Sequence, residues 1–198
     1  MNRWTKMLKR IFWKKLLEEQ GHICAYCMRR IPEKRKLPTG VASVTIEHWF
    51  PRNPGTKEDI GQGLNYRNMF AVCSGNRGCG NQEDLICDAR RGNRPIKVNP
   101  CDSETLCGIT YTSSGSIKSS DPVINAELNE KLNLNSEKIS LPENRKQVLL
   151  ALINDVRKNC KKGEISLYCK RKLEQIQDIS DPKMPYVGIL IWWLEKHV

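Results

Sequence analysis

The fold prediction for this chain begins with the stretch VTIEHWFP, residues 44–51. Its β-branched residues predict a short strand over 41–48, and Pro51 stops that strand. The strand ends in a carboxylate beside an imidazole, Glu47 and His48. Such a pair suits metal-assisted hydrolysis, because one group can hold a cation while the other takes a proton from water. The alternative is an exposed strand end without a chemical role, so the surrounding segments must decide.

The segments that follow place further polar residues next to short elements. A second apolar strand is predicted from Met69 to Cys73, with Asn68 at its entrance. A short helix is predicted from Leu85 to Gly92, and it contains the motif Cys87-Asp88-x-x-Arg91. The order is therefore a CxxC pair, a strand with Glu-His, a loop, an asparagine, a second strand and a Cys-Asp motif.

The chain contains nine cysteines, of which five lie between residues 24 and 87. In a reducing compartment, clustered cysteines are more typical of metal ligands than of disulfides. Cys24-Ala25-Tyr26-Cys27 is a CxxC pair that can bind one tetrahedral zinc ion, although two buried free thiols are the alternative. Cys87 is preferred over Cys79 as the fourth ligand, because it would anchor the helix that bears Asp88. The predicted zinc ligands are Cys24, Cys27, Cys73 and Cys87.

The charge distribution points to a polyanionic partner. The formal net charge is +11, and residues 1–100 hold 19 lysine or arginine residues against nine acidic ones. The excess of positive charge thus lies in the half that contains Glu47 and His48. Nucleic acid is the simplest polyanion to expect, whereas a basic surface without a ligand is the alternative.

Length and hydropathy favour a soluble globular protein. A chain of 198 residues can form one core, or a core with a small appended module. No run approaches the roughly 20 apolar residues of a membrane span. The basic N-terminus lacks the apolar core of a signal peptide, so we expect a cytoplasmic protein without a membrane partner.

The flanking segments predict helices on both sides of the strands. Residues 3–20 read as an amphipathic helix, with Ile11 on its apolar face. Residues 108–117 predict a hairpin that turns at Ser-Ser-Gly. From about residue 121 the pattern is helical, with helices over 164–177 and 186–196. We therefore predict an α+β chain with an N-terminal helix at 1–21, a central core at 22–120 and a helical region at 121–198 that docks a partner.

The ordered set of motifs resembles the HNH endonucleases, whose ββα-metal core is a β-hairpin and a helix around one divalent metal ion. The resemblance covers about residues 20–95, and its named positions fall on His48, Asn68 and Asp88. It implies that the chain hydrolyses nucleic-acid phosphodiester bonds. The alternative is a zinc-stabilised nucleic-acid-binding or interaction subunit without catalysis.

The residue chemistry agrees with each of these positions. His48 can deprotonate the attacking water, while Glu47 and Asp88 supply hard oxygen ligands for Mg²⁺ or Mn²⁺. Asn68 would orient His48 or brace the hairpin, and Arg91 could hold a phosphate with its planar fork. The HNH pattern more often has aspartate before the first histidine, where this chain has Glu47. The position given to Asp88 could instead be taken by Asp84 or Asn93.

Six segments carry a narrower resemblance: CAYCMRRI at 24–31, IEHWFP at 46–51, NYRNM at 65–69, CDARRGN at 87–93, Asn99-Pro100 and MPYVG at 184–188. In these segments the chain resembles the PtuB family, the HNH subunits of Septu-type antiphage systems, whose relatives also accompany retrons. That similarity implies a prokaryotic antiviral defence effector that works with an ATPase subunit of the PtuA type.

Overall fold

The computed structural model describes residues 3–32, 36–51, 65–79, 81–161, 163–178 and 182–198, with side chains from residue 11 onward. This part of the chain is α+β, with two small antiparallel sheets. Its elements are α1 (Arg3–Glu19), β1 (Val44–His48), η2 (Tyr66–Asn68), β2 (Met69–Cys73), η3 (Gln82–Asp84), α2 (Cys87–Arg91), α3 (Ser103–Leu106), β3 (Ile109–Tyr111), β4 (Ile117–Ser119), α4 (Pro122–Ala126), the π-helical turn η4 (Glu127–Lys131), α5 (Leu141–Asn159), α6 (Ile165–Asp178) and α7 (Val187–Glu195).

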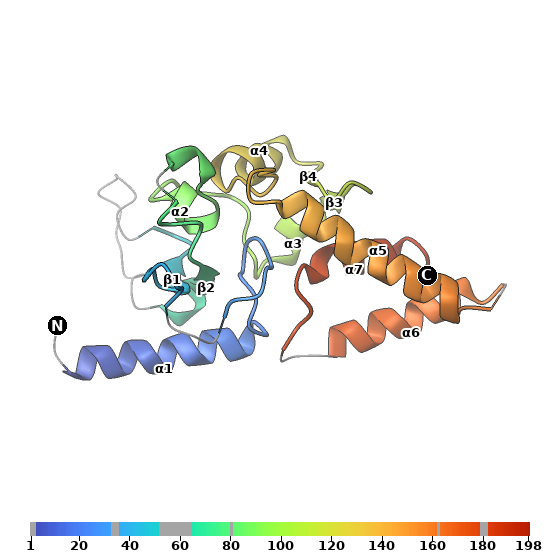
Figure 1. Cartoon of the computed structure of the whole chain (residues 1–198), viewed down its shortest axis with the longest axis horizontal. Helices are drawn as coiled ribbons and strands as arrows, with labels where there is room; N and C mark the ends of the chain where they lie inside the picture. Colours follow the sequence, from blue (N-terminus) through green and yellow to red (C-terminus); the bar gives the residue numbers. More distant parts are fainter. Residues whose placement is uncertain (1–2, 33–35, 52–64, 80, 162, 179–181) are drawn as a thin grey trace.

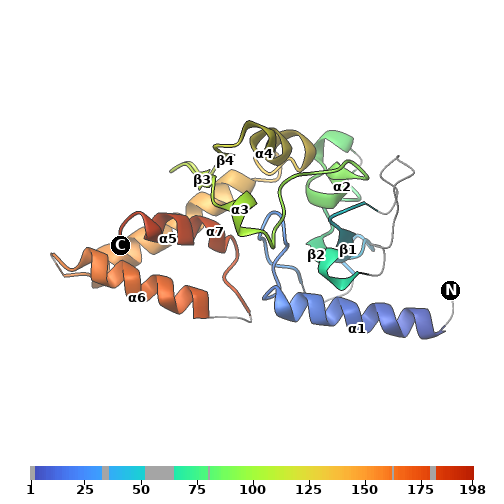
Figure 2. The same ribbon diagram turned by 180° about the vertical axis from the view of Figure 1, so that it is seen from behind.

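The elements lie in two groups along the long axis of the molecule (Figures 1 and 2). The β1–β2 hairpin lies between α1 and α2 at one end, whereas α5, α6 and α7 gather at the other. The short helices α3 and α4 lie between these groups, and the β3–β4 hairpin lies beside α5 and α7. The predicted region of zinc and acid–base chemistry is thus at the hairpin end.

The first sheet confirms both predicted strands of the hairpin. β1 pairs with β2 in antiparallel register, with Val44 opposite Cys73 and His48 opposite Met69. β1 starts at Val44 instead of residue 41, because residues 36–42 close a separate turn in which Leu37 N–H donates to Val41 O. The register places Cys73 and His48 at opposite ends of the hairpin.

The second sheet confirms the predicted hairpin after residue 108. β3 and β4 pair in antiparallel register from Ile109 opposite Ser119 to Tyr111 opposite Ile117. Gly115 in the connecting turn has a φ of +87°, and a Cβ there would lie 2.0 Å from Pro142 O. Glycine is therefore needed both for the turn and for its close approach to α5.

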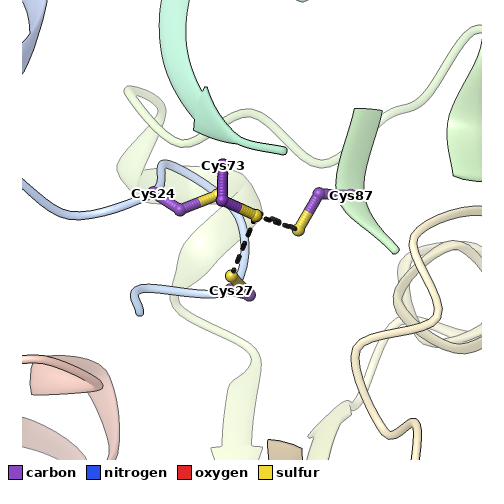
Figure 3. Close-up of side chains that lie close together, drawn as sticks. All are labelled: Cys24, Cys27, Cys73 and Cys87. Atoms are coloured by element: carbon purple, nitrogen blue, oxygen red, sulfur yellow. Dashed lines mark hydrogen bonds between the residues drawn. The ribbon is translucent and has the colours of Figure 1, made fainter. Parts of the chain in front are cut away.

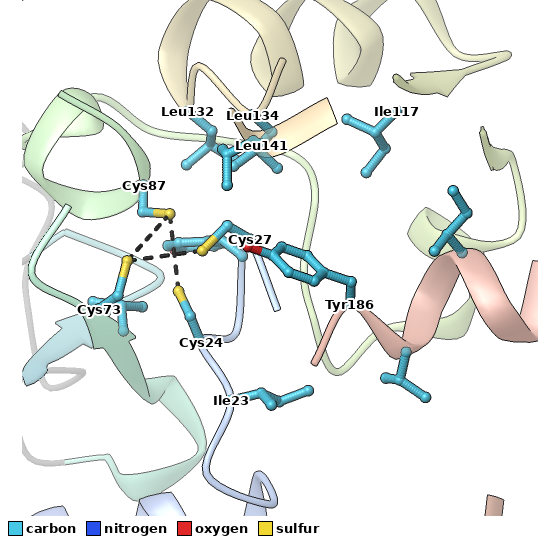
Figure 4. Packing of buried hydrophobic residues seen from close by; sticks show 14 of the residues in the cluster. Ile23, Cys24, Cys27, Cys73, Cys87, Ile117, Leu132, Leu134, Leu141 and Tyr186 are labelled. Atoms are coloured by element: carbon cyan, nitrogen blue, oxygen red, sulfur yellow. Dashed lines mark hydrogen bonds between the residues drawn. The ribbon is translucent and has the colours of Figure 1, made fainter. Parts of the chain in front are cut away.

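One cluster of buried apolar side chains joins the hairpin, the CxxC turn and the C-terminal helices (Figure 4). The predicted segments 1–21, 22–120 and 121–198 all contribute to it. Among the α1 side chains that the structure describes, from residue 11 onward, Leu16 and Leu17 are buried, whereas Ile11, predicted on the apolar face, is 54% exposed. The difference arises because the C-terminal end of the helix meets the sheet, where the Gln20 side chain both donates to and accepts from the backbone of Ala71.

The C-terminal helices are tied to the CxxC turn by an extended connection. α6 and α7 match the predicted helices within one residue at each end. Before α7, Lys183 N–H donates to Gly21 O at 3.0 Å and Tyr186 N–H donates to Met28 O at 2.8 Å. A Cβ at Gly188 would lie 2.6 Å from the Tyr111 hydroxyl, so glycine permits this close packing. Within the described residues, no helix is long and apolar enough to cross a membrane.

Candidate functional site

Four buried cysteines converge from three separate segments (Figure 3). Cys24 and Cys27 come from the turn after α1, where Met28 N–H donates to Cys24 O at 2.9 Å. Cys73 ends β2, and Cys87 is the first residue of α2. Their ligand atoms all lie within 4.8 Å of one another. The sequence-predicted set is therefore brought together in space.

The spacing of the sulfur atoms matches a tetrahedral zinc site. With zinc–sulfur bonds of about 2.3 Å, the edge of a regular tetrahedron is about 3.8 Å. The Sγ–Sγ distance is 3.8 Å for Cys24–Cys87, Cys27–Cys73 and Cys73–Cys87. The competing ligand, Cys79, is exposed and donates instead to Asn81 O. These four cysteines could thus hold one zinc ion, with Cys87 as the fourth ligand.

The electrostatics of the cluster favour neutral thiols at Cys27 and Cys87 and a thiolate at Cys73 in the absence of metal. Burial raises the pKa of the Cys27 and Cys87 thiols, whereas hydrogen bonds from neighbouring thiols lower the pKa of Cys73. Burial opposes the charge of Arg29, but the nearby cysteines outweigh it and raise the pKa of this guanidinium. A single thiolate can be held by its neighbours and Arg29, but four thiolates need a metal ion.

A separate cavity of about 170 Å³ brings together the predicted acid–base and metal-binding residues. Glu47 and His48 reach it from the end of β1, and Asp88 reaches it from α2. Of the two alternatives to Asp88, Asn93 also lines the cavity, whereas Asp84 forms an ion pair with Lys138 at 2.9 Å. The lining consists of Thr45, Ile46, Glu47, His48, Pro51, Asp88, Gly92 and Asn93.

Glu47 and Asp88 form a close carboxyl pair at this cavity. Burial, followed by the hydrogen bond and charge of Asp88, raises the pKa of Glu47 to about 8. Arg91 and Tyr26 oppose the rise, and the Tyr26 hydroxyl donates to Glu47 Oε1 at 3.3 Å. Two carboxylates crowded together are stabilised by a shared cation, and their oxygens suit Mg²⁺ or Mn²⁺. Glu47 and Asp88 could therefore hold a divalent ion.

Arg91 does not lie where the predicted phosphate contact requires it. Its side chain is 0% exposed and forms an ion pair with Glu47. A guanidinium enclosed by acceptors of its own chain has no exposed N–H to offer a substrate. In this structure Arg91 instead holds Glu47 and the turn after β1. Its acceptors are Glu47 Oε1, the Tyr26 hydroxyl and the carbonyl oxygens of His48, Trp49 and Arg94.

We expect Arg91→Ala to destabilise the protein by about 3–5 kcal/mol, because removing one partner of a buried ion pair leaves Glu47 buried without its cation. Urea denaturation in the presence of zinc would measure the change. Arg90→Ala is the matched control on the same helix, since Arg90 bonds the carbonyl oxygens of Glu130 and Gln82 near the surface. Unchanged stability together with a raised KM would instead support the phosphate contact.

Asn68 braces the turn that follows β1. Its side-chain oxygen accepts from Phe50 N–H at 2.7 Å, and its amide nitrogen donates to Phe50 O at 3.0 Å. Its backbone oxygen also accepts from Trp49 N–H at 3.0 Å. These bonds hold the segment directly after His48, and the two roles predicted for Asn68, orienting His48 or bracing the hairpin, stay predictions.

Two residues of the site were not predicted from the sequence. Tyr26, in the middle of the CxxC motif, connects the cysteine turn to Glu47 and Arg91. Arg77 forms an ion pair with Asp88 at 2.7 Å. The position of Tyr26 between two ligands and the glycines on both sides of Arg77 are the local signals that could have singled them out.

A scan against known protein-family models finds no match to this chain, and a search of curated proteins finds none.

Proposed function

We propose that this chain is a metal-dependent HNH-type endonuclease that hydrolyses phosphodiester bonds of nucleic acid. The observation that carries the proposal is the cavity in which Glu47, His48 and Asp88 meet. Its residues come from a β-hairpin and the helix after it, in the order that the ββα-metal fold has. The net charge of +11 also favours a polyanionic substrate.

In the proposed reaction, His48 accepts a proton from the water that attacks phosphorus. Glu47 and Asp88 hold Mg²⁺ or Mn²⁺, which when bound neutralises charge at the scissile phosphate. Arg91 and Tyr26 hold the Glu47 carboxyl group in place, and Asn68 fixes the turn after His48. The positioning roles proposed for Arg91, Tyr26 and Asn68 are thus supported by contacts of their own side chains.

In this proposal the cysteine cluster is a structural zinc site that positions the cavity residues. Cys87 directly precedes Asp88, and Tyr26 lies between Cys24 and Cys27. A zinc ion bound to these cysteines would therefore fix both carboxylates of the cavity, one through α2 and one through the Tyr26 hydroxyl.

The biological setting that we propose is antiviral defence, in a complex with an ATPase subunit of the PtuA type. This part rests on the resemblance of the sequence to PtuB subunits. The helical region over residues 121–198 is the proposed docking segment, and in α6 the side chains of Ile165 and Leu167 are each 49% exposed.

Cleavage assays on supercoiled plasmid DNA and on RNA, with and without the ATPase subunit, would test the nuclease proposal. We expect cleavage that requires added Mg²⁺ or Mn²⁺ and stops on mild chelation, while zinc analysis shows the cysteine site still loaded. A preparation that never cleaves with either metal, even beside its partner, would refute the nuclease function.

The second candidate is a zinc-stabilised binding subunit without catalysis. One observation favours it: Glu47 is only 7% exposed and bonds Arg91 and Tyr26, as a purely structural carboxylate would. A chain that binds nucleic acid with high affinity but never cleaves it would support this candidate.

A further inference from the structure

Arg77 presents a partly exposed guanidinium at the edge of the proposed active-site cavity. One Nη donates to Asp88 Oδ2 at 2.7 Å, and the other donates to Thr45 Oγ1 at 3.3 Å. Both partners line the cavity. The Arg77 side chain is 40% exposed, whereas that of Asp88 is 13% exposed. The positive charge of Arg77 therefore lies between the cavity and solvent.

The loop that carries Arg77 is held in a defined position. Gly75 O accepts from Ile86 N–H at 3.1 Å, and the Asn76 side chain donates to Asp84 O at 3.1 Å. Gly75 has a φ of +64°, and a Cβ there would lie 2.4 Å from Ala89 Cβ. The loop is thus packed against α2, so that Arg77 is presented to the cavity by a rigid support.

The neighbouring arginines around α2 form hydrogen bonds or ion pairs with other groups of the protein itself. Arg91 is fully enclosed and paired with Glu47. Arg90 Nη1 donates to Gln82 O at 3.1 Å, and Arg94 Nη2 donates to Arg90 O at 2.6 Å. Arg77 also pairs with a proposed metal ligand, Asp88, but it differs from Arg91 because its side chain is 40% exposed. When Asp88 coordinates a divalent ion, its charge is neutralised and its bond to Arg77 weakens.

We propose that Arg77, and not Arg91, binds a phosphate of the nucleic-acid substrate. This inference rests on the proposed nuclease function. In the metal-free protein Arg77 neutralises Asp88, and in the metal-loaded protein its planar fork is available to two phosphate oxygens. Before metal binds, Arg77 thereby reduces the charge repulsion between the carboxylates of Glu47 and Asp88. After metal binds, it attracts the polyanionic substrate.

The proposal predicts opposite effects of Arg77→Ala on metal and on nucleic acid. Mn²⁺ binding, measured by calorimetry, is expected to become about two- to five-fold tighter, because a competing cation has left Asp88. Binding of a labelled DNA duplex or RNA of equal length, measured with Mg²⁺ in a His48→Ala background to prevent turnover, is expected to weaken about ten-fold. Its salt dependence should fall by the equivalent of about one phosphate contact.

The controls separate this inference from the nuclease proposal. Arg157→Ala removes the same charge from the exposed face of α5 and should change neither measurement. Arg77→Lys keeps the charge without the fork and should restore the salt dependence but only part of the affinity. If Arg77→Ala leaves nucleic-acid affinity and salt dependence unchanged while the parent chain still cleaves, the inference is wrong and the nuclease proposal stands. A parent that neither binds nor cleaves nucleic acid overturns both.

Discussion

Replacing Cys87 with serine is expected to release zinc and unfold the hairpin end of the molecule. Cys87 is 0% exposed, and its Sγ lies 3.8 Å from those of Cys24 and Cys73. Structural zinc contributes about 10–16 kcal/mol of apparent binding free energy in zinc-finger peptides. A domain has a total stability of only about 5–15 kcal/mol, so release of the zinc ion is enough to unfold it.

Cys79→Ser is the matched control for Cys87→Ser. Cys79 is exposed, so its serine variant should bind about one equivalent of zinc and melt like the parent protein. Metal analysis of the purified proteins and circular dichroism through a thermal scan would measure both effects. A folded, zinc-loaded Cys87→Ser together with a metal-free Cys79→Ser would assign the fourth ligand to Cys79 instead.

Under the proposed nuclease mechanism, replacing His48 with alanine is expected to lower the cleavage rate by about 10²–10⁴-fold, because the attacking water would lose its proton acceptor. His48 lines the cavity together with Glu47 and Asp88, and it ends the strand that the cysteine cluster supports. The loss should appear in kcat, with little change in nucleic-acid affinity. Initial rates with Mg²⁺ or Mn²⁺, under the conditions in which the parent cleaves, would measure it.

The control for His48 is His197, a histidine near the C-terminus. His197 stacks on Trp193 with ring centroids 3.9 Å apart and is exposed, so His197→Ala should cleave like the parent. Unchanged melting curves of both variants would exclude unfolding as the cause of a lower cleavage rate. Equal cleavage by His48→Ala and the parent would remove His48 from the mechanism.

Much of the architecture could be predicted from local sequence pattern. The strands at Val44–His48 and Met69–Cys73 are short β-branched or apolar runs between turn residues, and α6 and α7 follow helical periodicity. Such patterns depend on neighbours along the chain, so they can be read without knowledge of the fold. The exposure of Ile11 could not be predicted in this way, because the extent of the surface beneath α1 depends on distant segments.

The choice among similar residues in the site depended on contacts between distant segments. Arg91 and Arg77 are both arginines near Asp88 in sequence, but only the structure places the first inside the protein and the second at the cavity edge. The raised pKa of Glu47 likewise results from burial and from Asp88, which lies on another element. Burial and mutual distance are properties of the folded chain, and sequence spacing does not determine them.

The stretch at residues 44–51 by itself determined a strand that ends with Glu47 and His48, and the cysteine spacing indicated a metal site. Only the tertiary structure decided that Cys87 completes the cysteine cluster and that Arg91 is buried in an ion pair with Glu47. It also brought Asp88 to the cavity of His48. The physical reason is that residue type and local order define the available chemistry, whereas packing of distant segments defines which groups are buried together and which face solvent.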